Sequence, residues 1–361
     1  MSLLTTGEAH WAESVRDTAG RMLNEELASF EPIGGGRNSQ VYRLVTEGGG
    51  QYALKAYFRH GADPRDRLGT ELDGLRFLWN NGVRDVPRPV MGDRQQGVAI
   101  YEYIEGERAS TGPASEHDMD AAVRFLARLK DLKEQPGSRT LSPASEACFS
   151  IGSITSNIHG RLARLTDVQS TAAPCNGLAA FLRNELIPGL AAVVDWCRTR
   201  SSQARISFDD ELEPAGRTLS PSDFGLHNAL RRSDGRLVFV DFEYFGWDDP
   251  AKMVADVLLH PAMDLCSGLK RRFVDGILHH FREYPHLPHR MEIVYPLFGI
   301  KWCLIMLNEF LPEHLSRRRF AHEGAKAETF QQQAVQMEQL IKAKSLWQKI
   351  RDEYENFPYI G

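Results

Sequence analysis

Three polar residues between positions 223 and 241 have the types and the spacing that phosphoryl transfer requires. The stretch SPSDFGLHNAL, residues 220–230, contains Asp223 and, five positions later, Asn228. Asp241 comes thirteen positions after Asn228, at the end of the apolar run RLVFV. In this reaction one carboxylate orients the attacking hydroxyl and accepts its proton, while an amide oxygen and a second carboxylate hold Mg²⁺ against the phosphates. The spacing predicts Asp223 as the base, and Asn228 and Asp241 as metal ligands.

The letters Asp-Phe-Gly at 223–225 spell the metal-binding tripeptide of protein kinases, but the order of elements gives that role to another tripeptide. In the kinase template D-x4-N comes first, a strand follows, and the metal-binding Asp-Phe-x comes after the strand. Asp241-Phe242-Glu243 stands in that place. A single aspartate or asparagine in a loop commonly makes an Asx turn or caps a helix. The assignment therefore depends on further elements of the same pattern.

A glycine-rich stretch, IGGGRNSQVY, precedes a predicted strand near the start of the chain. Because glycine has no Cβ, backbone N–H groups there can approach phosphate oxygens. No Gly-Lys-Ser/Thr follows, so the stretch is not a Walker loop, and a glycine-rich turn alone is weak evidence of a ligand. The candidate phosphate-binding residues of this loop are Gly34, Gly35, Gly36 and Ser39.

Lys55 lies between apolar residues in the next predicted strand, YALKAY. A buried lysine is costly unless an anion accompanies it. Glu71 comes three positions after Leu68 and four before Leu75, so it shares the apolar face of its predicted helix. We expect Lys55 to pair with Glu71 and to contact nucleotide phosphates. The alternative is a strand lysine that faces solvent.

The elements that must position these residues divide the chain into two regions, 1–104 and 105–361. In the first we expect a helix at 8–28, strands in QVYRLVT, QYALKAYF and QQGVAIYEYIEGE, and a helix at 66–80. In the second we expect helices at about 115–135, 177–200, 251–283, 289–311 and 325–356, around one β-rich island, LVFVDFEYF. The predicted fold class is α+β, with a small β-rich lobe, a larger helical lobe and a ligand cleft between them.

Composition excludes several classes of partner. The net charge of −5 provides no positive electrostatic field that would attract nucleic acid or anionic lipid. The sequence contains no run of about 18 apolar residues, so we expect no membrane span. The first residues lack the basic and apolar regions of a signal peptide. Five scattered cysteines without metal-ligand spacing indicate reduced thiols. We therefore expect a cytoplasmic protein.

Taken together, these elements resemble the aminoglycoside phosphotransferase and choline kinase superfamily, whose protein-kinase-like folds act on small molecules. The usual motifs of that superfamily are His-Gly-Asp-x4-Asn, then Ile/Val-Asp-Phe-Glu, and a Gly-Asp-Pro with a later Asp. The counterparts here are PSDFGLHN, VDFEYFGWDDP and MVADVLL, and the resemblance runs from about Phe30 to Pro261. Pro221-Ser222 replaces the usual His-Gly, so the acceptor of a particular subgroup is not carried over.

The resemblance implies ATP and Mg²⁺ as cofactors, with GTP left open, and transfer of the γ-phosphate to a hydroxyl of a small molecule. A sugar, an amino alcohol and an aminoglycoside all fit. Tyr101 would stand at the back of the nucleotide pocket, and Glu102 C=O and Ile104 N–H would contact the purine edge. Asp256 would brace the catalytic loop, and we interpret His227 as a loop histidine packed on the lobe.

Two other readings remain open at this level. The altered Pro221-Ser222 pair is compatible with a non-catalytic nucleotide-binding regulator that has a kinase-like fold. A nucleotidyl transferase on the same fold is the other. A protein kinase is disfavoured because only seven residues separate Asp241 from Asp249-Pro250, too few for an activation segment. Neither the acceptor nor the oligomeric state follows from the sequence.

Overall fold

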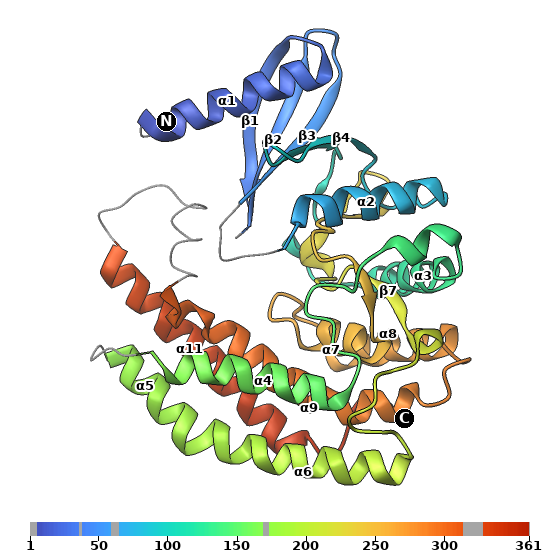
Figure 1. The fold of residues 1–361 in the computed structure, drawn as a ribbon, viewed down its shortest axis with the longest axis vertical. Helices are drawn as coiled ribbons and strands as arrows, with labels where there is room; N and C mark the ends of the chain where they lie inside the picture. Colours follow the sequence, from blue (N-terminus) through green and yellow to red (C-terminus); the bar gives the residue numbers. More distant parts are fainter. Residues whose placement is uncertain (1–5, 36–37, 59–64, 169–172, 313–327, 361) are drawn as a thin grey trace. The chain divides into compact units, whose positions relative to one another are not determined.

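The computed structural model describes residues 6–35, 38–58, 65–168, 173–312 and 328–360, which form two compact units (Figure 1). Unit 1 contains the described residues up to Ala109 together with Asn228–Phe245. Unit 2 contains Ser110–His227 and the described residues from Gly246 onward. A short segment that carries Asn228 and Asp241 therefore belongs to the N-terminal unit, although it lies far along the chain.

An antiparallel sheet of five strands forms the centre of unit 1, in the order β1-β2-β3-β5-β4. The strands are β1 (Leu27–Gly35), β2 (Ser39–Thr46), β3 (Gln51–Tyr57), β4 (Pro89–Asp93) and β5 (Val98–Glu102). The turn between β2 and β3 contains Gly49 at φ 85°, a left-handed conformation that glycine adopts without strain. The sequence did not predict β1 and β4, because proline and glycine interrupt the apolar alternation of both.

Two helices of unit 1 lie beside this sheet. Helix α1 (Thr6–Leu23) buries Val15 and Ala19 in one apolar cluster with Leu44 and Leu54 of the sheet. Helix α2 (Arg67–Asn80) begins after Asp66, whose side chain accepts a hydrogen bond from Gly69 N–H and so caps the helix. Helix α2 falls within its predicted segment, 66–80, whereas α1 begins two residues before its predicted segment, 8–28, and ends at Leu23 because β1 begins at Leu27.

A small sheet in the order β6-β8-β9 completes unit 1. Its strands are β6 (Glu107–Arg108), β8 (Ala229–Arg231) and β9 (Leu237–Phe239). The last two form a hairpin in which Ala229 pairs with Phe239 and Arg231 with Leu237. Strand β9 lies in the predicted β-rich island, LVFVDFEYF, whereas β8 was not predicted. The register of the hairpin sets the positions of the polar residues at its end.

Unit 2 is mainly helical. Its long helices are α3 (Glu116–Leu132), α4 (Ile151–Thr166), α5 (Ala173–Phe181), α6 (Ile187–Ala204), α7 (Pro250–Leu259), α8 (Ser267–His280), α9 (Leu287–Met306) and α11 (Glu328–Glu353). Short helical turns are η1 (Ala109–Thr111), η2 (Pro136–Thr140), η3 (Leu182–Leu186), η4 (Pro214–Gly216), η5 (Leu226–Asn228) and η6 (Leu307–Phe310). Helix α9 is buried along most of its length and packs against α4, α6, α7 and α11.

The single helix predicted at 251–283 is wrong, because α7 and α8 are separate helices. Pro261 lies just past the end of α7 and cannot donate the N–H that a continuing helix needs. A two-stranded sheet of β7 (Thr218–Ser220) and β10 (Gly246–Asp248) precedes α7, with Trp247 opposite Leu219.

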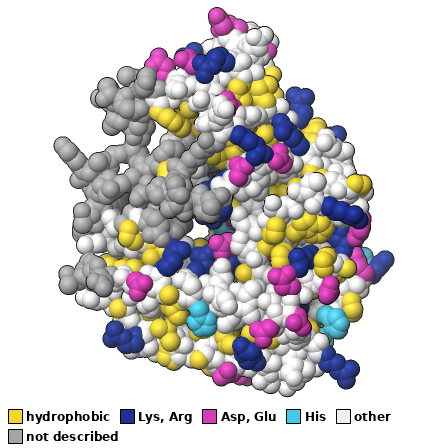
Figure 2. Space-filling view, in the orientation of Figure 1, with side chains coloured by type: hydrophobic (Ala, Val, Ile, Leu, Met, Phe, Trp, Pro, Cys, Tyr) yellow, Lys and Arg dark blue, Asp and Glu magenta, His cyan; other side chains and the backbone are white. Residues whose placement is uncertain are grey.

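Two helical segments are long and apolar enough to cross a membrane, Pro174–Ala204 and Leu287–Phe310. The second is 89% buried within the structure, as expected for the core helix of a globular unit, so this is weak evidence for a membrane span. Figure 2 shows acidic and basic side chains interspersed on the face drawn, without a large patch of one sign. The absence of membrane and nucleic-acid partners stays a prediction.

Gly246 offers a direct test of how β10 is held. A Cβ at this position would lie 2.2 Å from the Ser142 carbonyl oxygen and 2.7 Å from Ala144 N, and neither backbone atom can yield easily. We expect Gly246→Ala to lower the free energy of unfolding by about 1–3 kcal/mol in urea denaturation. Gly160→Ala on α4 is the control, because a Cβ there meets no atom within 4 Å. Equal stability of the two variants would contradict this packing.

Candidate active site

Lys55 on β3 gathers the carboxylates of unit 1. Its Nζ donates to Glu71 Oε2 at 2.7 Å and to Asp241 Oδ1 at 2.5 Å, and lies 3.8 Å from Glu243 Oε2. The predicted Lys55–Glu71 ion pair is thus present, and the solvent-facing alternative is wrong because Lys55 is only 7% exposed. Burial by itself lowers the pKa of Lys55, but Asp241 and the two glutamates outweigh burial and hold that pKa well above its ordinary value.

Glu71 connects this lysine to the backbone of the Asp-Phe-Glu tripeptide. Its Oε2 also accepts a hydrogen bond from Tyr57 OH at 2.7 Å, and its Oε1 accepts one from Phe242 N–H at 3.2 Å. The carboxylate is buried on the inner face of α2, where its spacing from Leu68 and Leu75 predicted it. Glu71 therefore positions both the ammonium of Lys55 and the chain beside Asp241.

Glu243 is a site residue that the sequence analysis did not select. It is 4% exposed, and its Oε1 accepts a hydrogen bond from Asn38 Nδ2 at 2.7 Å. Its Oε2 has no hydrogen-bond partner among the described residues. Burial, reinforced by Asp241, raises the pKa of Glu243 to about 7. The Asp-x-Glu spacing at the end of β9 is the signal that could have identified it.

Carboxylate oxygens of Glu71, Asp241 and Glu243 lie within 4.8 Å of one another. One ammonium faces three carboxylates, so the cluster retains an excess of negative charge. Hard oxygen donors of this kind suit Mg²⁺, and the unpartnered Oε2 of Glu243 is an acceptor that a cation would satisfy. The residues present therefore fit a magnesium ion.

The β8–β9 hairpin brings the two predicted metal ligands to one end. Val240 N–H donates to the Asn228 carbonyl at 2.9 Å, next to the Ala229–Phe239 pair. Asp241 follows immediately, with its backbone at φ 69° and its side chain 37% exposed. Antiparallel pairing thus places residues thirteen positions apart beside each other.

The glycine stretch joins β1 to β2. Gly34 pairs with Val41 and Gly35 with Gln40, whereas Gly36 lies outside the described residues. Ser39 begins β2 and is buried. The neighbouring Asn38 donates through Nδ2 to Glu243 Oε1 and to Tyr244 OH, at 2.7 and 2.6 Å. One end of the glycine stretch is therefore tied to the tripeptide that carries Asp241.

The residues expected near the nucleotide base lie on and after β5. Tyr101 is buried, and its hydroxyl is 2.7 Å from that of Tyr57. Glu102 ends the strand, and its N–H donates to the Arg88 carbonyl at 2.8 Å. Ile104 follows in an extended segment and is 6% exposed. Their contact with a nucleotide stays a prediction.

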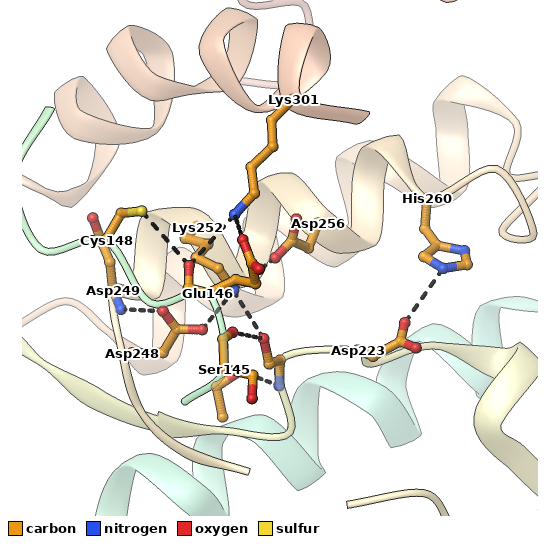
Figure 3. A network of polar contacts seen from close by, with 12 residues as sticks. Ser145, Glu146, Cys148, Asp223, Asp248, Asp249, Lys252, Asp256, His260 and Lys301 are labelled. Carbon is orange, nitrogen blue, oxygen red and sulfur yellow. Dashed lines mark hydrogen bonds and ion pairs between the residues drawn. The ribbon is translucent and has the colours of Figure 1, made fainter. Parts of the chain in front are cut away.

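Asp223 belongs to unit 2, where two histidines hold one of its oxygens. Its Oδ1 lies 3.1 Å from His227 Nε2 and 3.3 Å from His260 Nε2, and the two rings stack with centroids 3.9 Å apart. Figure 3 shows the contact between Asp223 and His260. His260 Nδ1 accepts a hydrogen bond from Ala262 N–H, so the neutral ring carries its proton on Nε2 and donates to Asp223. Burial favours the neutral acid, but these two donors hold the pKa of Asp223 below its ordinary value.

His227 packs in the loop as expected, and it also contacts the predicted base. His260, at the end of α7, was missed because 32 residues separate it from His227 and no motif connects the two. Asp256 accepts hydrogen bonds from Lys252 Nζ at 2.9 Å and from Trp302 Nε1 at 3.0 Å. Lys252 in turn donates to Ser222 Oγ, so the predicted brace reaches the loop through a lysine.

A model of the phosphotransferase enzyme family matches residues 29–293, which include all the site residues described above. The chain belongs to this family. The match confirms the predicted superfamily of small-molecule kinases, and with it the prediction of a phosphotransferase. No curated protein sequence matches the chain.

Solved structures agree in fold. Spectinomycin phosphotransferase in complex with ADP and spectinomycin has a TM-score of 0.63 at 11% identity, covering 96% of this chain and 99% of its own. Choline kinase from Streptococcus pneumoniae has a TM-score of 0.58 at 16% identity, covering 94% and 99%. The gentamicin complex of APH(2″)-IIa has a TM-score of 0.60 at 16% identity, covering 99% and 100%. These similarities confirm the predicted two-lobed α+β fold.

The excess of carboxylates around Lys55 predicts an unusual effect of removing one of them. Glu243→Gln keeps an acceptor for Asn38 and removes a buried charge from the cluster, so we expect the Tm in EDTA to stay the same or rise by several degrees. Glu107→Gln on the exposed strand β6 is the matched control and should not change the Tm. A clear fall in the Tm of Glu243→Gln would show that the carboxylate is needed to hold Lys55.

His260→Ala removes one of the two donors to Asp223. The folded-state pKa of Asp223 is depressed, so its contribution to stability is present above the unfolded pKa near 4 and is lost as pH falls below it. We expect the variant to lose about 1 kcal/mol of stability at pH 7, since Asp223 is partly exposed. The loss should shrink as the pH falls below about 4 in urea denaturation. A loss independent of pH would indicate packing against His227 instead.

Proposed function

We propose that the protein is a Mg²⁺-ATP-dependent phosphotransferase that moves the γ-phosphate to a hydroxyl of a small molecule. The observation that carries this proposal is the Lys55 ammonium held between Glu71 and Asp241 at 2.7 and 2.5 Å. One partner of the buried Lys55, Glu71, is fixed on a helix, and the other, Asp241, is a partly exposed carboxylate. The lysine is therefore positioned to contact phosphate oxygens and the cation that accompanies them. Membership of the phosphotransferase family supports this interpretation.

Each part of unit 1 receives a role in this proposal. Asp241 and Asn228 at the end of the hairpin would hold Mg²⁺, and Glu243 would add a buried acceptor near Asp241. The ion neutralises charge on the phosphate oxygens when bound. Lys55 contacts the α- and β-phosphates. The loop residues Gly34, Gly35, Gly36 and Ser39 direct backbone N–H groups to the phosphates.

Asp223 is the proposed base. Two imidazole donors keep its carboxylate ionised near neutral pH, which a proton acceptor requires. The carboxylate orients the acceptor hydroxyl for attack on the γ-phosphorus and takes its proton as the new P–O bond forms. The bond between the γ-phosphorus and the β–γ bridging oxygen breaks at the same time, and ADP leaves. A carboxylate of low pKa is a weak proton acceptor, so early removal of the proton contributes little to the rate of transfer. Orientation of the hydroxyl is the larger contribution of Asp223 to that rate.

ATP is the proposed phosphate donor, with GTP as a second candidate. Structures similar in fold include an ADP complex with spectinomycin and a ternary complex of ATP and streptomycin. Tyr101, Glu102 and Ile104, on and after β5, are the residues proposed to contact the purine. The acceptors named for the similar structures are aminoglycosides, spectinomycin, macrolides, choline and ethanolamine. We infer a sugar or amino-alcohol hydroxyl as the acceptor here.

The thiols support a proposal for the cellular setting. All five cysteines are free, and four of them are buried. Burial raises the pKa of Cys197 to about 12, so this thiol is unreactive at neutral pH. We propose a cytoplasmic enzyme that acts on a diffusible substrate, without nucleic acid or membrane as partner.

Asp223→Asn tests the role of the base. The amide keeps the size of the side chain but cannot accept the proton, so we expect the rate of phosphoryl transfer to fall by about 10³-fold or more. Binding of ATP and Mg²⁺, measured by thermal shift, should change little because the nucleotide ligands belong to unit 1. Unchanged turnover would remove Asp223 from the mechanism.

The acceptor is identified by incubating the protein with Mg²⁺-ATP and pools of sugars, amino alcohols and aminoglycosides, while ADP release is measured. We expect one pool to accelerate ADP release over the rate with water, and the product to gain the mass of one phosphate. A gain of AMP mass would establish a nucleotidyl transferase. Nucleotide binding without transfer from any pool would support the regulator interpretation.

A further inference from the structure

We propose that Lys252 is a positioning residue for Asp223, and that it acts through the hydroxyl of Ser222. The kinetic part of this proposal rests on the proposed function. The structural part rests on a buried polar network of unit 2 in which Lys252 links α7 to the residue that precedes the base (Figure 3).

Ser222 occupies a backbone conformation that suits glycine better than serine. Its φ is 68°, in the left-handed region that residues with a Cβ seldom adopt. The side chain gives the reason for serine, because its Oγ donates to the Ser145 carbonyl at 3.0 Å and accepts from Lys252 Nζ at 3.1 Å. The Ser222 N–H donates to Ser220 Oγ, also at 3.0 Å. Three hydrogen bonds thus hold a strained residue next to Asp223.

The ammonium of Lys252 has three acceptors for its three N–H groups. Besides Ser222 Oγ, these are Asp248 Oδ2 at 2.7 Å and Asp256 Oδ2 at 2.9 Å. Lys252 is 1% exposed, and a buried ammonium is stable only when it is paired and fully hydrogen-bonded. Ser222 supplies the one neutral acceptor, so it completes the coordination without adding a further charge.

The same network reaches α9, which is buried along most of its length. Asp256 accepts a hydrogen bond from Trp302 Nε1 on α9. Asp249, which follows Asp248 in the chain, accepts a hydrogen bond from Arg290 Nε, also on α9, at 2.7 Å. Asp249 N–H donates to Asp248 Oδ1 at 3.0 Å. The loop before the base is therefore anchored to α7 and, through α7 and β10, to α9.

This arrangement accounts for Ser222 in a position where the related motif has glycine. Glycine would adopt the same φ without strain, so backbone geometry does not require serine. What serine adds is the hydroxyl that receives Lys252. The Ser222 hydroxyl holds the backbone that precedes Asp223, and His227 and His260 hold the Asp223 carboxylate.

Two substitutions separate the hydroxyl from the backbone strain. Ser222→Gly removes Oγ and relieves the left-handed φ, whereas Ser222→Ala removes Oγ and keeps the strain. If the hydroxyl positions the base, both variants should lose at least 10-fold in kcat for ADP release from Mg²⁺-ATP, with little change in KM for ATP. Water serves as the acceptor until a hydroxyl substrate is identified. Arg205→Gly, at φ 56° on the exposed end of α6, is the control for relief of strain and should keep full activity.

Lys252→Arg and Lys252→Met test whether Lys252 is the residue that acts through the Ser222 hydroxyl. The double variant Ser222→Ala/Lys252→Met should lose no more activity than Lys252→Met alone, because both changes interrupt the same connection. Losses that multiply would overturn the proposed connection. Lys252→Met leaves Asp248 and Asp256 without their cation, so if it does not fold the Ser222 variants decide the question.

A spectroscopic measurement distinguishes this proposal from the proposed function. The imidazole NMR signals of His227 and His260, assigned with His227→Gln and His260→Gln, report the position of the Asp223 carboxylate. They should shift in both Ser222 variants and not in Arg205→Gly. Unmoved signals together with unchanged kcat would overturn the positioning role. A wild-type protein that transfers phosphate to no acceptor would contradict the proposed function, while the histidine signals would still test the position of Asp223.

Discussion

The site of unit 1 depends on one buried ammonium. Lys55 brings together carboxylates from helix α2 and from the segment after β9, which would otherwise repel one another in a poorly solvated place. Removing one lysine would leave three acids without their cation, whereas removing one acid leaves the rest paired. The sheet, the inserted helix and the hairpin can therefore be understood as the frame that delivers these groups to one point.

Unit 2 uses the same physical device at another place. Lys252 is also buried and also pairs with two carboxylates, Asp248 and Asp256, and its third contact is a hydroxyl next to a functional acid. In both units a lysine with a long apolar stem on a regular element pairs with carboxylates. A buried ion pair adds little net stability, but its demand for complete hydrogen bonding allows few alternative arrangements. We infer that both lysines specify geometry more than they stabilise the fold.

Much of the site could be predicted because its groups follow local rules. Glu71 shares a helical face with Leu68 and Leu75, and this periodicity alone turned it inward toward Lys55. Glu243 was not identified, because the Asp-Phe-Glu tripeptide was interpreted through its aspartate alone. His260 was not identified, because it contacts Asp223 only in the folded chain, at the end of α7. The break between α7 and α8 was not predicted, because the apolar residues on both sides of Pro261 were interpreted as one continuous helix.

The sequence by itself determined the reaction class, since the order of glycines, lysine, glutamate, D-x4-N and Asp-Phe-Glu is a chain of short-range spacings. It also determined the strand of Lys55, the helix of Glu71 and the strand before Asp241, because periodicity is local. Only the tertiary structure decided that Ser222 receives Lys252 and that His260 holds Asp223. These two contacts join residues 30 and 37 positions apart, and their partners are chosen by packing and by the need to satisfy every buried polar group, which no local pattern records.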